Sequence, residues 1–186
     1  MGNHEHTKTG ASHGLLSPSM VPGTAAAKAR GLVLATQVPV ICQEILVKAG
    51  PMAALRFLNA RTRYRFTGLY RVDSSLLRTV HLYDRENPTL SLSGDVAPIA
   101  ATYCAIVADD NRAFATGDSR NDARLENHAA RERVLSYCGV PIRGSDDGVW
   151  GTLCHYDVRP RLLLDTESYV LEAVAPLFAE CVTRDD

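Results

Sequence analysis

Apolar positions in the N-terminal part of the chain recur at about every third or fourth residue, the spacing of a helix that buries one face. The pattern covers residues 25–49, with Pro39 marking a start or a kink. Gly50-Pro51 ends it, because glycine suits the position just past a helix and proline the first turn of the next. We therefore predict one helix over residues 25–49 and a second over residues 51–63.

The apolar period then shortens to that of strands. Residues 66–73 and 77–84 flank the turn signal Asp73-Ser74-Ser75 and predict an antiparallel hairpin. A clearer hairpin follows over residues 135–142 and 149–157, joined by a turn that begins and ends with glycine. Antiparallel pairing is therefore expected in both halves of the chain.

The remaining segments carry weaker patterns. Residues 85–95 predict a loop and residues 112–116 a short strand, while residues 99–108 fit a short helix or a strand equally well. A final helix is expected from Thr166, whose hydroxyl suits a capping position, to about Thr183. The order of elements predicts an α+β fold, with a central antiparallel sheet and helices on one face.

Length and composition fit one globular domain. The chain has 186 residues; we assign 25–186 to the domain and 1–24 to a disordered leader. Lys and Arg number 20 against 21 Asp and Glu, and this net charge of −1 removes the usual electrostatic argument for nucleic acid. No stretch approaches the roughly 20 apolar residues of a membrane span, so no membrane partner is expected.

The cysteines and the leader bear on the compartment. The leader has no basic segment followed by a continuous apolar run, so we predict no secretory signal and a cytoplasmic protein. In that compartment the five cysteines of the protein are expected to be reduced thiols, and no two of them are spaced Cys-x-x-Cys. The leader histidines (His4, His6 and His13) would hold a metal only weakly, so no metal site is predicted.

Three motifs resemble the GAF domain family in their order and spacing. They are Phe66-Thr67-Gly68-Leu69-Tyr70-Arg71-Val72-Asp73, Tyr137-Cys138-Gly139-Val140-Pro141-Ile142 and Gly148-Val149-Trp150-Gly151-Thr152-Leu153-Cys154. The similarity covers about residues 35–182 and is strongest to standalone bacterial GAF proteins. It implies a sheet of about six antiparallel strands, with the N- and C-terminal helices on one face and a small-molecule pocket under loops and short helices on the other.

Two thiols lie on the strands of the last hairpin. If paired residue numbers sum to 292, Cys138 and Cys154 face each other; if they sum to 291, their side chains point to opposite faces. A facing pair in the pocket is a candidate redox sensor if one thiol has a lowered pKa. The alternative is two small buried apolar side chains.

An enzymatic alternative also follows from the resemblance. Some standalone GAF proteins are free methionine-(R)-sulfoxide reductases, which implies a reactive cysteine in the loop before the Gly-Val-Pro strand. Residues 119–134 contain no cysteine, and Cys138 lies inside the strand. Cys104 falls where a partner thiol is expected. A thiol-dependent enzyme that uses Cys104, Cys138 or Cys154 therefore stays open.

The charged segment over residues 119–134 is the main candidate for ligand binding, because its short helices would cover the pocket. If it is helical, four basic residues share one face: Arg120, Arg124, His128 and Arg131. With Asp118 and Asp122 they would grip an acidic or zwitterionic metabolite, or else form a solvated face of ion pairs. Candidate apolar walls with polar tips, which would serve equally as core, are Tyr103, Tyr137 and Trp150.

These observations predict a non-catalytic sensory module that binds an unidentified small molecule. Its cofactor, if any, is unknown: Cys154 and His155 are adjacent on a strand and point to opposite faces, so they would not ligate one haem. Signalling is expected through a homodimer or a separate output protein. Apolar stripes on the terminal helices would form the dimer or cover the sheet: Val40, Ile41 and Ile45, and Leu171, Val174, Leu177 and Phe178.

Overall fold

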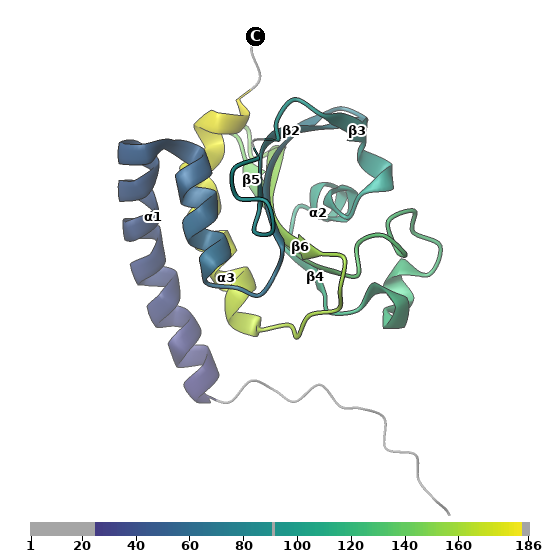
Figure 1. Ribbon diagram of the computed structural model, residues 1–186, viewed down its shortest axis with the longest axis horizontal. Coiled ribbons are helices and arrows are strands. Elements are labelled where there is room, and N and C mark those ends of the chain that lie inside the picture. Colours follow the sequence, from purple (N-terminus) through teal and green to yellow (C-terminus); the bar gives the residue numbers. More distant parts are fainter. Residues whose placement is uncertain (1–24, 91, 184–186) are drawn as a thin grey trace, which may run out of the picture.

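In the computed structural model, which describes residues 25–90 and 92–183, six strands form one antiparallel sheet in the order β3-β2-β1-β6-β5-β4 (Figure 1). The strands are β1 (Phe66–Asp73), β2 (Leu76–Asp84), β3 (Val96–Pro98), β4 (Phe114–Thr116), β5 (Ser136–Arg143) and β6 (Val149–Asp157). The predicted α+β fold and both hairpins are confirmed, and β3 is an additional edge strand. The predicted leader lies outside the described residues.

Two helical segments cover one face of the sheet. Helix α1 (Ala25–Ala60) is two helices joined at Gly50, whose φ of 82° breaks the helical path just before Pro51. The second half of α1 lies beside α3 (Asp165–Val174) against the sheet, and the first half packs outside them (Figure 1). The break at Gly50 agrees with the sequence, although the second helix ends at Ala60 rather than at residue 63.

The C-terminal helix differs from its prediction. Thr166 does not cap it: Leu164 precedes the first turn and makes no side-chain capping hydrogen bond. After Val174 the chain tightens into a 3-10 helix, η4 (Ala175–Val182), because Pro176 has no N–H to continue the α-helical ladder. The helical segment thus ends at Val182, close to the predicted end, but it changes from α to 3-10 geometry after Val174.

The opposite face of the sheet carries short elements. They are η1 (Ile99–Ala101), α2 (Cys104–Asp110), η2 (Ser119–Asn121) and η3 (Ala123–Leu125). The open choice over residues 99–108 is thus resolved as helix. Figure 1 shows α2 on the side of the sheet away from α1 and α3.

The sheet is buried on both faces, and strand alternation divides its residues between two cores. Leu69, Val140 and Leu153 pack with the helices, together with Leu55 and Leu171. Residues such as Tyr70, Tyr137 and Cys154 pack instead under α2 and the following loops. Each central strand therefore supplies side chains to both sides.

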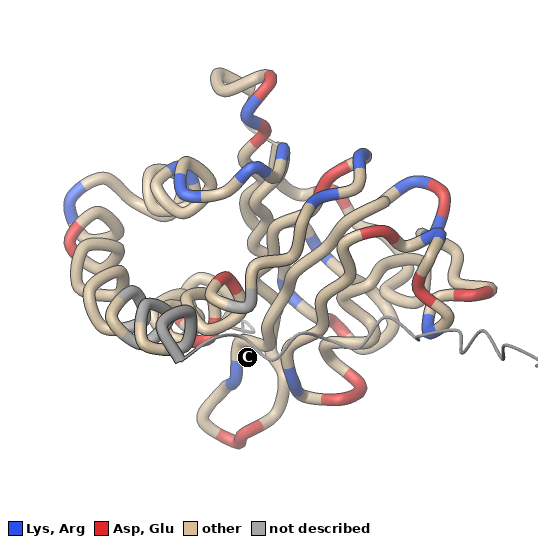
Figure 2. Tube along the Cα trace, turned by 90° about the horizontal axis from the view of Figure 1, so that it is seen from below, with Lys and Arg blue, Asp and Glu red and all other residues tan. Residues whose placement is uncertain are grey.

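Segment Thr36–Ala60 is long and apolar enough, by composition alone, to cross a bilayer. Gly50 divides it, and Ala54, Leu55 and Leu58 in its second half belong to the core of the domain. Its apolarity is thus explained in part by packing on the sheet. Figure 2 shows basic and acidic residues close together along the loops.

Candidate functional site

A cavity of about 410 Å³ lies on the face of the sheet opposite α1 and α3. Its floor comes from the central strands, and its cover comes from residues 95–104 and 130–134. Exposed lining residues, among them Asp95, Val96 and Arg133, show that the cavity reaches the surface. The size and mostly apolar lining suit a small organic molecule.

Cys154 stands in the middle of the floor between two glycines. It pairs with Gly68 on β1 and with Gly139 on β5. The ring of Tyr70 folds over Gly68 and the ring of Tyr137 over Gly139, in positions where a Cβ on either glycine would collide with the ring. The glycines thus allow two tyrosines to lie flat beside the Cys154 thiol.

Cys104, the first residue of α2, lies in the cover of the cavity, opposite this floor. Its Sγ lies 3.4 Å from Tyr137 Oη. Interaction with the Cys154 thiol lowers the pKa of Cys104 to about 7 against the effect of burial, and hydroxyl groups of Thr152, Tyr137 and Thr102 add to this effect. Cys104 is therefore the thiol most readily ionised in this cavity.

Cys154 and the tyrosines of the cavity floor stay protonated. Burial raises the pKa of Cys154 well above its usual value, and it does the same for Tyr70 and Tyr137. Tyr70 and Tyr156 share a hydrogen bond of 3.3 Å between their hydroxyl groups. At the cavity floor, Cys104 is thus one acidic thiol among neutral donors.

The register separates the two thiols of the last hairpin. Gly139 pairs with Cys154 and Cys138 with His155, so paired numbers sum to 293 and neither sum expected from the sequence applies. Cys138 and Cys154 consequently point to opposite faces. Burial beneath the helices raises the pKa of Cys138 to about 12. The thiol partner of Cys154 is Cys104 instead.

The charged segment forms two separate 3-10 turns, not one helix, so its basic residues share no single face. Asp118 accepts the backbone N–H and side chain of Arg120, and Asp122 does the same for Arg124. Each carboxylate closes its own turn, which competes with continuous helix. Of the expected set, Asp118, Arg120, Asp122, Arg124, His128 and Arg131 all lie outside the cavity lining.

Four of the expected site residues do line the cavity: Tyr103, Cys104, Tyr137 and Cys154. Trp150 lies instead at the turn of the last hairpin, where its Nε1 donates to Asp146 Oδ1 at 3.0 Å. Sequence reasoning missed Tyr70, Tyr156 and Arg133. Strand alternation carries the signal for Tyr156, which is two residues from Cys154 and so shares its face.

A polar network lies directly behind the cavity floor. His155 is fully buried, with Nδ1 2.7 Å from Thr67 Oγ1 and Nε2 3.3 Å from Glu167 Oε1 on α3. Asn59 of α1 donates to the same threonine hydroxyl at 2.8 Å. This network joins β6 to both helices on the far side of the sheet.

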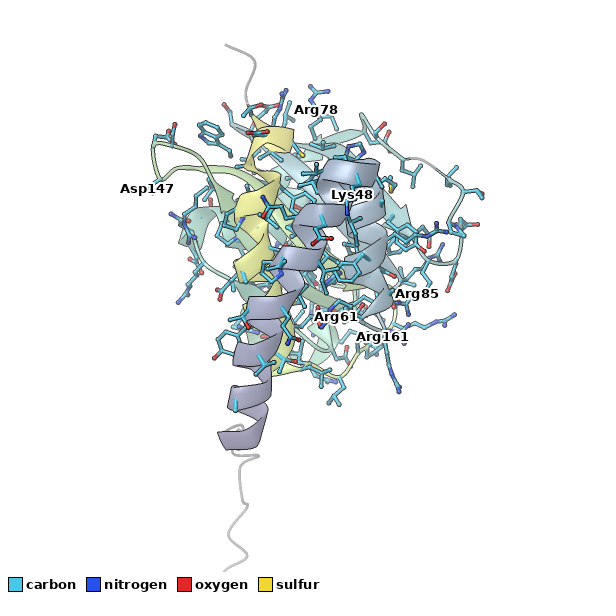
Figure 3. The ribbon with its side chains drawn as sticks, turned by 90° about the vertical axis from the view of Figure 1, so that its left-hand side faces the viewer. Lys48, Arg61, Arg78, Arg85, Asp147 and Arg161 are labelled. Carbon is cyan, nitrogen blue, oxygen red and sulfur yellow. The ribbon has the colours of Figure 1, made fainter. Side chains whose placement is uncertain are left out.

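A second cleft, of about 640 Å³, lies at the end of the molecule where Figure 3 labels Arg61 and Arg161. Arg161 is already engaged there, because its guanidinium holds Asp157 at 2.6 Å. Over residues 25–90 and 92–183, no group of three His, Cys, Asp or Glu side chains is placed to hold a metal ion. The cavity over the sheet therefore remains the stronger candidate for a ligand site.

Solved structures with the same fold include proteins of different activities. One is free methionine-R-sulfoxide reductase from Neisseria meningitidis in complex with its substrate, at 17% identity and TM-score 0.60, over 88% of this chain and 93% of that one. Another is the GAF domain of Acinetobacter phosphoenolpyruvate-protein phosphotransferase, at 14% and 0.60, over 82% and 92%. A third is the chromophore-binding domain of the Stigmatella aurantiaca bacteriophytochrome, at 11% and 0.61, over 86% and 62%.

At these identities the likeness establishes the fold and leaves the activity open. A comparison with curated proteins gives no match. The family model for the GAF domain, however, matches residues 38–182, from the buried Val38 of α1 to the end of η4. This chain belongs to the GAF domain family.

Proposed function

We propose that this protein is a non-catalytic sensory module that binds a small metabolite in the cavity over the sheet. The observation that carries the proposal is the cavity of about 410 Å³. Two tyrosine rings at its floor lie over Gly68 and Gly139, where a larger residue would collide with them. An apolar body would fill the interior, and a charged end would meet Arg133 or Asp95 at the rim. A cytoplasmic location agrees with five cysteines that form no disulfide.

Filling the cavity tests this proposal. Ala101 lines the cavity, whereas its neighbour Ala100 is exposed and outside the lining, so Ala101→Phe and Ala100→Phe form a matched pair. We expect native mass spectrometry to show a bound metabolite, or a metabolite panel to raise the melting temperature, in the wild type and Ala100→Phe only. Equal binding by both variants would place the ligand elsewhere.

Signalling through a homodimer is the second part of the proposal. The C-terminal stripe does not support it, because Leu171, Val174 and Phe178 are buried against the sheet. The first half of α1 lies on the outside of the molecule, toward the viewer in Figure 3. Three valines of this helix are exposed at intervals of seven residues: Val33, Val40 and Val47. This heptad spacing suits pairing with α1 of a second copy.

Introducing a charged residue into this valine stripe tests whether the stripe forms a dimer interface or is an ordinary exposed surface. Val40 is 59% exposed, so Val40→Glu leaves the domain core intact and is expected to give a folded monomer. Ala49→Glu, which is also exposed on α1 but lies two residues after Val47 and so away from the valine stripe, is the matched control for adding a carboxylate. Light scattering measures the mass. A wild-type monomer, or an unchanged dimer in Val40→Glu, would direct signalling to a separate output protein.

The acidic thiol in the cavity favours one other function, a thiol-dependent oxidoreductase acting on a sulfoxide. The substrate-bound reductase named above has the same fold. Consumption of NADPH in the presence of thioredoxin, thioredoxin reductase and free methionine sulfoxide is the direct assay. Turnover abolished by Cys104→Ser would establish this function in place of the non-catalytic one.

A further inference from the structure

We propose that Cys104 and Cys154 form a reversible disulfide inside the cavity when Cys104 reacts with a hydroperoxide. The inference goes beyond the binding role and holds whichever metabolite the cavity accepts. It rests on the packing of Cys104, the first residue of α2, against the part of the sheet that contains Cys154 on β6.

The two thiols line the same cavity and belong to the same buried cluster, and each alters the pKa of the other. They come from separate elements, so the link would tie α2 to β6. Both sulfurs line the cavity, which gives a small oxidant a path from the surface although the two side chains are only 3% and 1% exposed. The open space on one side and the partner thiol on the other fit a peroxidatic and a resolving cysteine.

The groups around each sulfur indicate which cysteine is peroxidatic and which is resolving. Tyr137 Oη lies 3.4 Å from the sulfur of Cys104, and interaction with Cys154 and nearby hydroxyl groups lowers the pKa of Cys104. The titratable groups near Cys104 are Cys154, Tyr137 and, farther away, Tyr70 and Tyr156, and burial keeps all four protonated. These donors stabilise a thiolate on Cys104, so it is the nucleophile and Cys154 the thiol that follows.

The chemistry balances with hydrogen peroxide as the oxidant. The Cys104 thiolate attacks one peroxide oxygen, the O–O bond breaks, and hydroxide leaves, so that Cys104 becomes a sulfenic acid. The Cys154 thiol then attacks that sulfur, the S–O bond breaks, and water leaves as the S–S bond forms. The hydroxide takes up the proton first lost by Cys104. In sum, two thiols lose two electrons and one peroxide becomes two waters.

The other cysteines are unsuited to this reaction. Burial raises the pKa of Cys42 to about 11 and that of Cys138 to about 12, and both lie on the helix side of the sheet. Cys181 also packs on that side, and burial raises its pKa. Reaction is therefore expected at Cys104 first, and Cys181→Ser is a control that removes a thiol without touching the cavity.

Peptide mapping tests the link directly. Tryptic cleavage after Arg and Lys places Cys104 in residues 86–112, Cys138 in residues 134–143 and Cys154 in residues 144–161. Protein treated with equimolar hydrogen peroxide, then blocked with N-ethylmaleimide, should yield a cross-link between the first and third peptides in the wild type and in Cys181→Ser. Dithiothreitol should reverse it.

Two variants assign the roles. Cys154→Ser should form no cross-link and should instead accumulate a sulfenic acid on Cys104 that dimedone traps. Cys104→Ser should leave Cys154 fully open to N-ethylmaleimide. Circular dichroism checks that each variant folds. Three results in the wild type would each overturn the proposal: absence of the cross-link, a link from Cys104 to another cysteine, or dimedone labelling of Cys104 without the link.

The outcome is separable from that of the binding proposal. Disulfide formation is read as a covalent link in protein without added metabolite, whereas binding is read from the Ala101→Phe and Ala100→Phe pair. A failure of one readout leaves the other standing.

Discussion

Replacing Tyr137 by phenylalanine removes the phenol oxygen that lies 3.4 Å from Cys104 Sγ and leaves the ring over Gly139 in place. A hydrogen bond to a charged group contributes about 1.5–3 kcal/mol, and about 1.4 kcal/mol corresponds to one pKa unit. Since Cys154, Thr152 and Thr102 also stabilise the thiolate, the lower end of that range applies. We therefore expect the pKa of Cys104 to rise from about 7 to about 8.

At pH 7 this change lowers the thiolate fraction from about one half to about one tenth, so that alkylation slows about fivefold. The assay follows iodoacetamide labelling of the peptide over residues 86–112 between pH 5.5 and 9.5 by mass spectrometry. Tyr156→Phe is the control, because that phenol lines the same cavity but bonds to Tyr70. An unchanged midpoint in Tyr137→Phe, or an equal shift in both variants, would refute the hydrogen-bond explanation.

Three further predictions concern the cavity floor, the core and acid stability. Gly139→Ala should shift the labelling midpoint as well, because the new methyl group displaces the phenol ring that folds over it. Leu171→Ala, fully buried against the sheet, should lower the free energy of unfolding by about 2–5 kcal/mol in urea titrations, while Leu162→Ala, 86% exposed, should change it little. Hydrogen bonding to Arg65 lowers the pKa of Asp84 to about 2, below its value in the unfolded chain. The stability that the ionised Asp84 contributes is therefore complete above about pH 5 and disappears toward pH 2. Asp84→Asn should flatten this loss of stability in acid-unfolding curves.

The spacing of apolar residues predicted the helices and strands better than it predicted the register between the strands. The two hairpins are evident because turn residues separate strand-like runs. In β5, however, every residue from Ser136 to Ile142 is buried, since both faces of the sheet are covered. A strand buried on both sides shows no alternation, so the pattern did not reveal which side Cys138 occupies.

The covering segments resisted prediction for a different reason. Spacing alone suggested a helix with one basic face, yet Asp118 and Asp122 each bind the backbone N–H two residues later and end regular helix locally. The edge strand β3 has only three residues, too few to show a period. Thiol pairing between Cys104 and Cys154 depends on how α2 packs over the sheet, and a single sequence does not encode that contact in any local pattern.

The double burial of the sheet also restricts where the sequence can vary to reshape the cavity. Along β6, Cys154 belongs to the cavity and His155, the next residue, to the network between the helices. A substitution in this strand therefore disturbs either the binding floor or the support of the helices, and no position in its centre is neutral. New ligand preferences would have to arise in the cover, over residues 95–104 and 130–134, where short segments tolerate replacement without unseating the sheet.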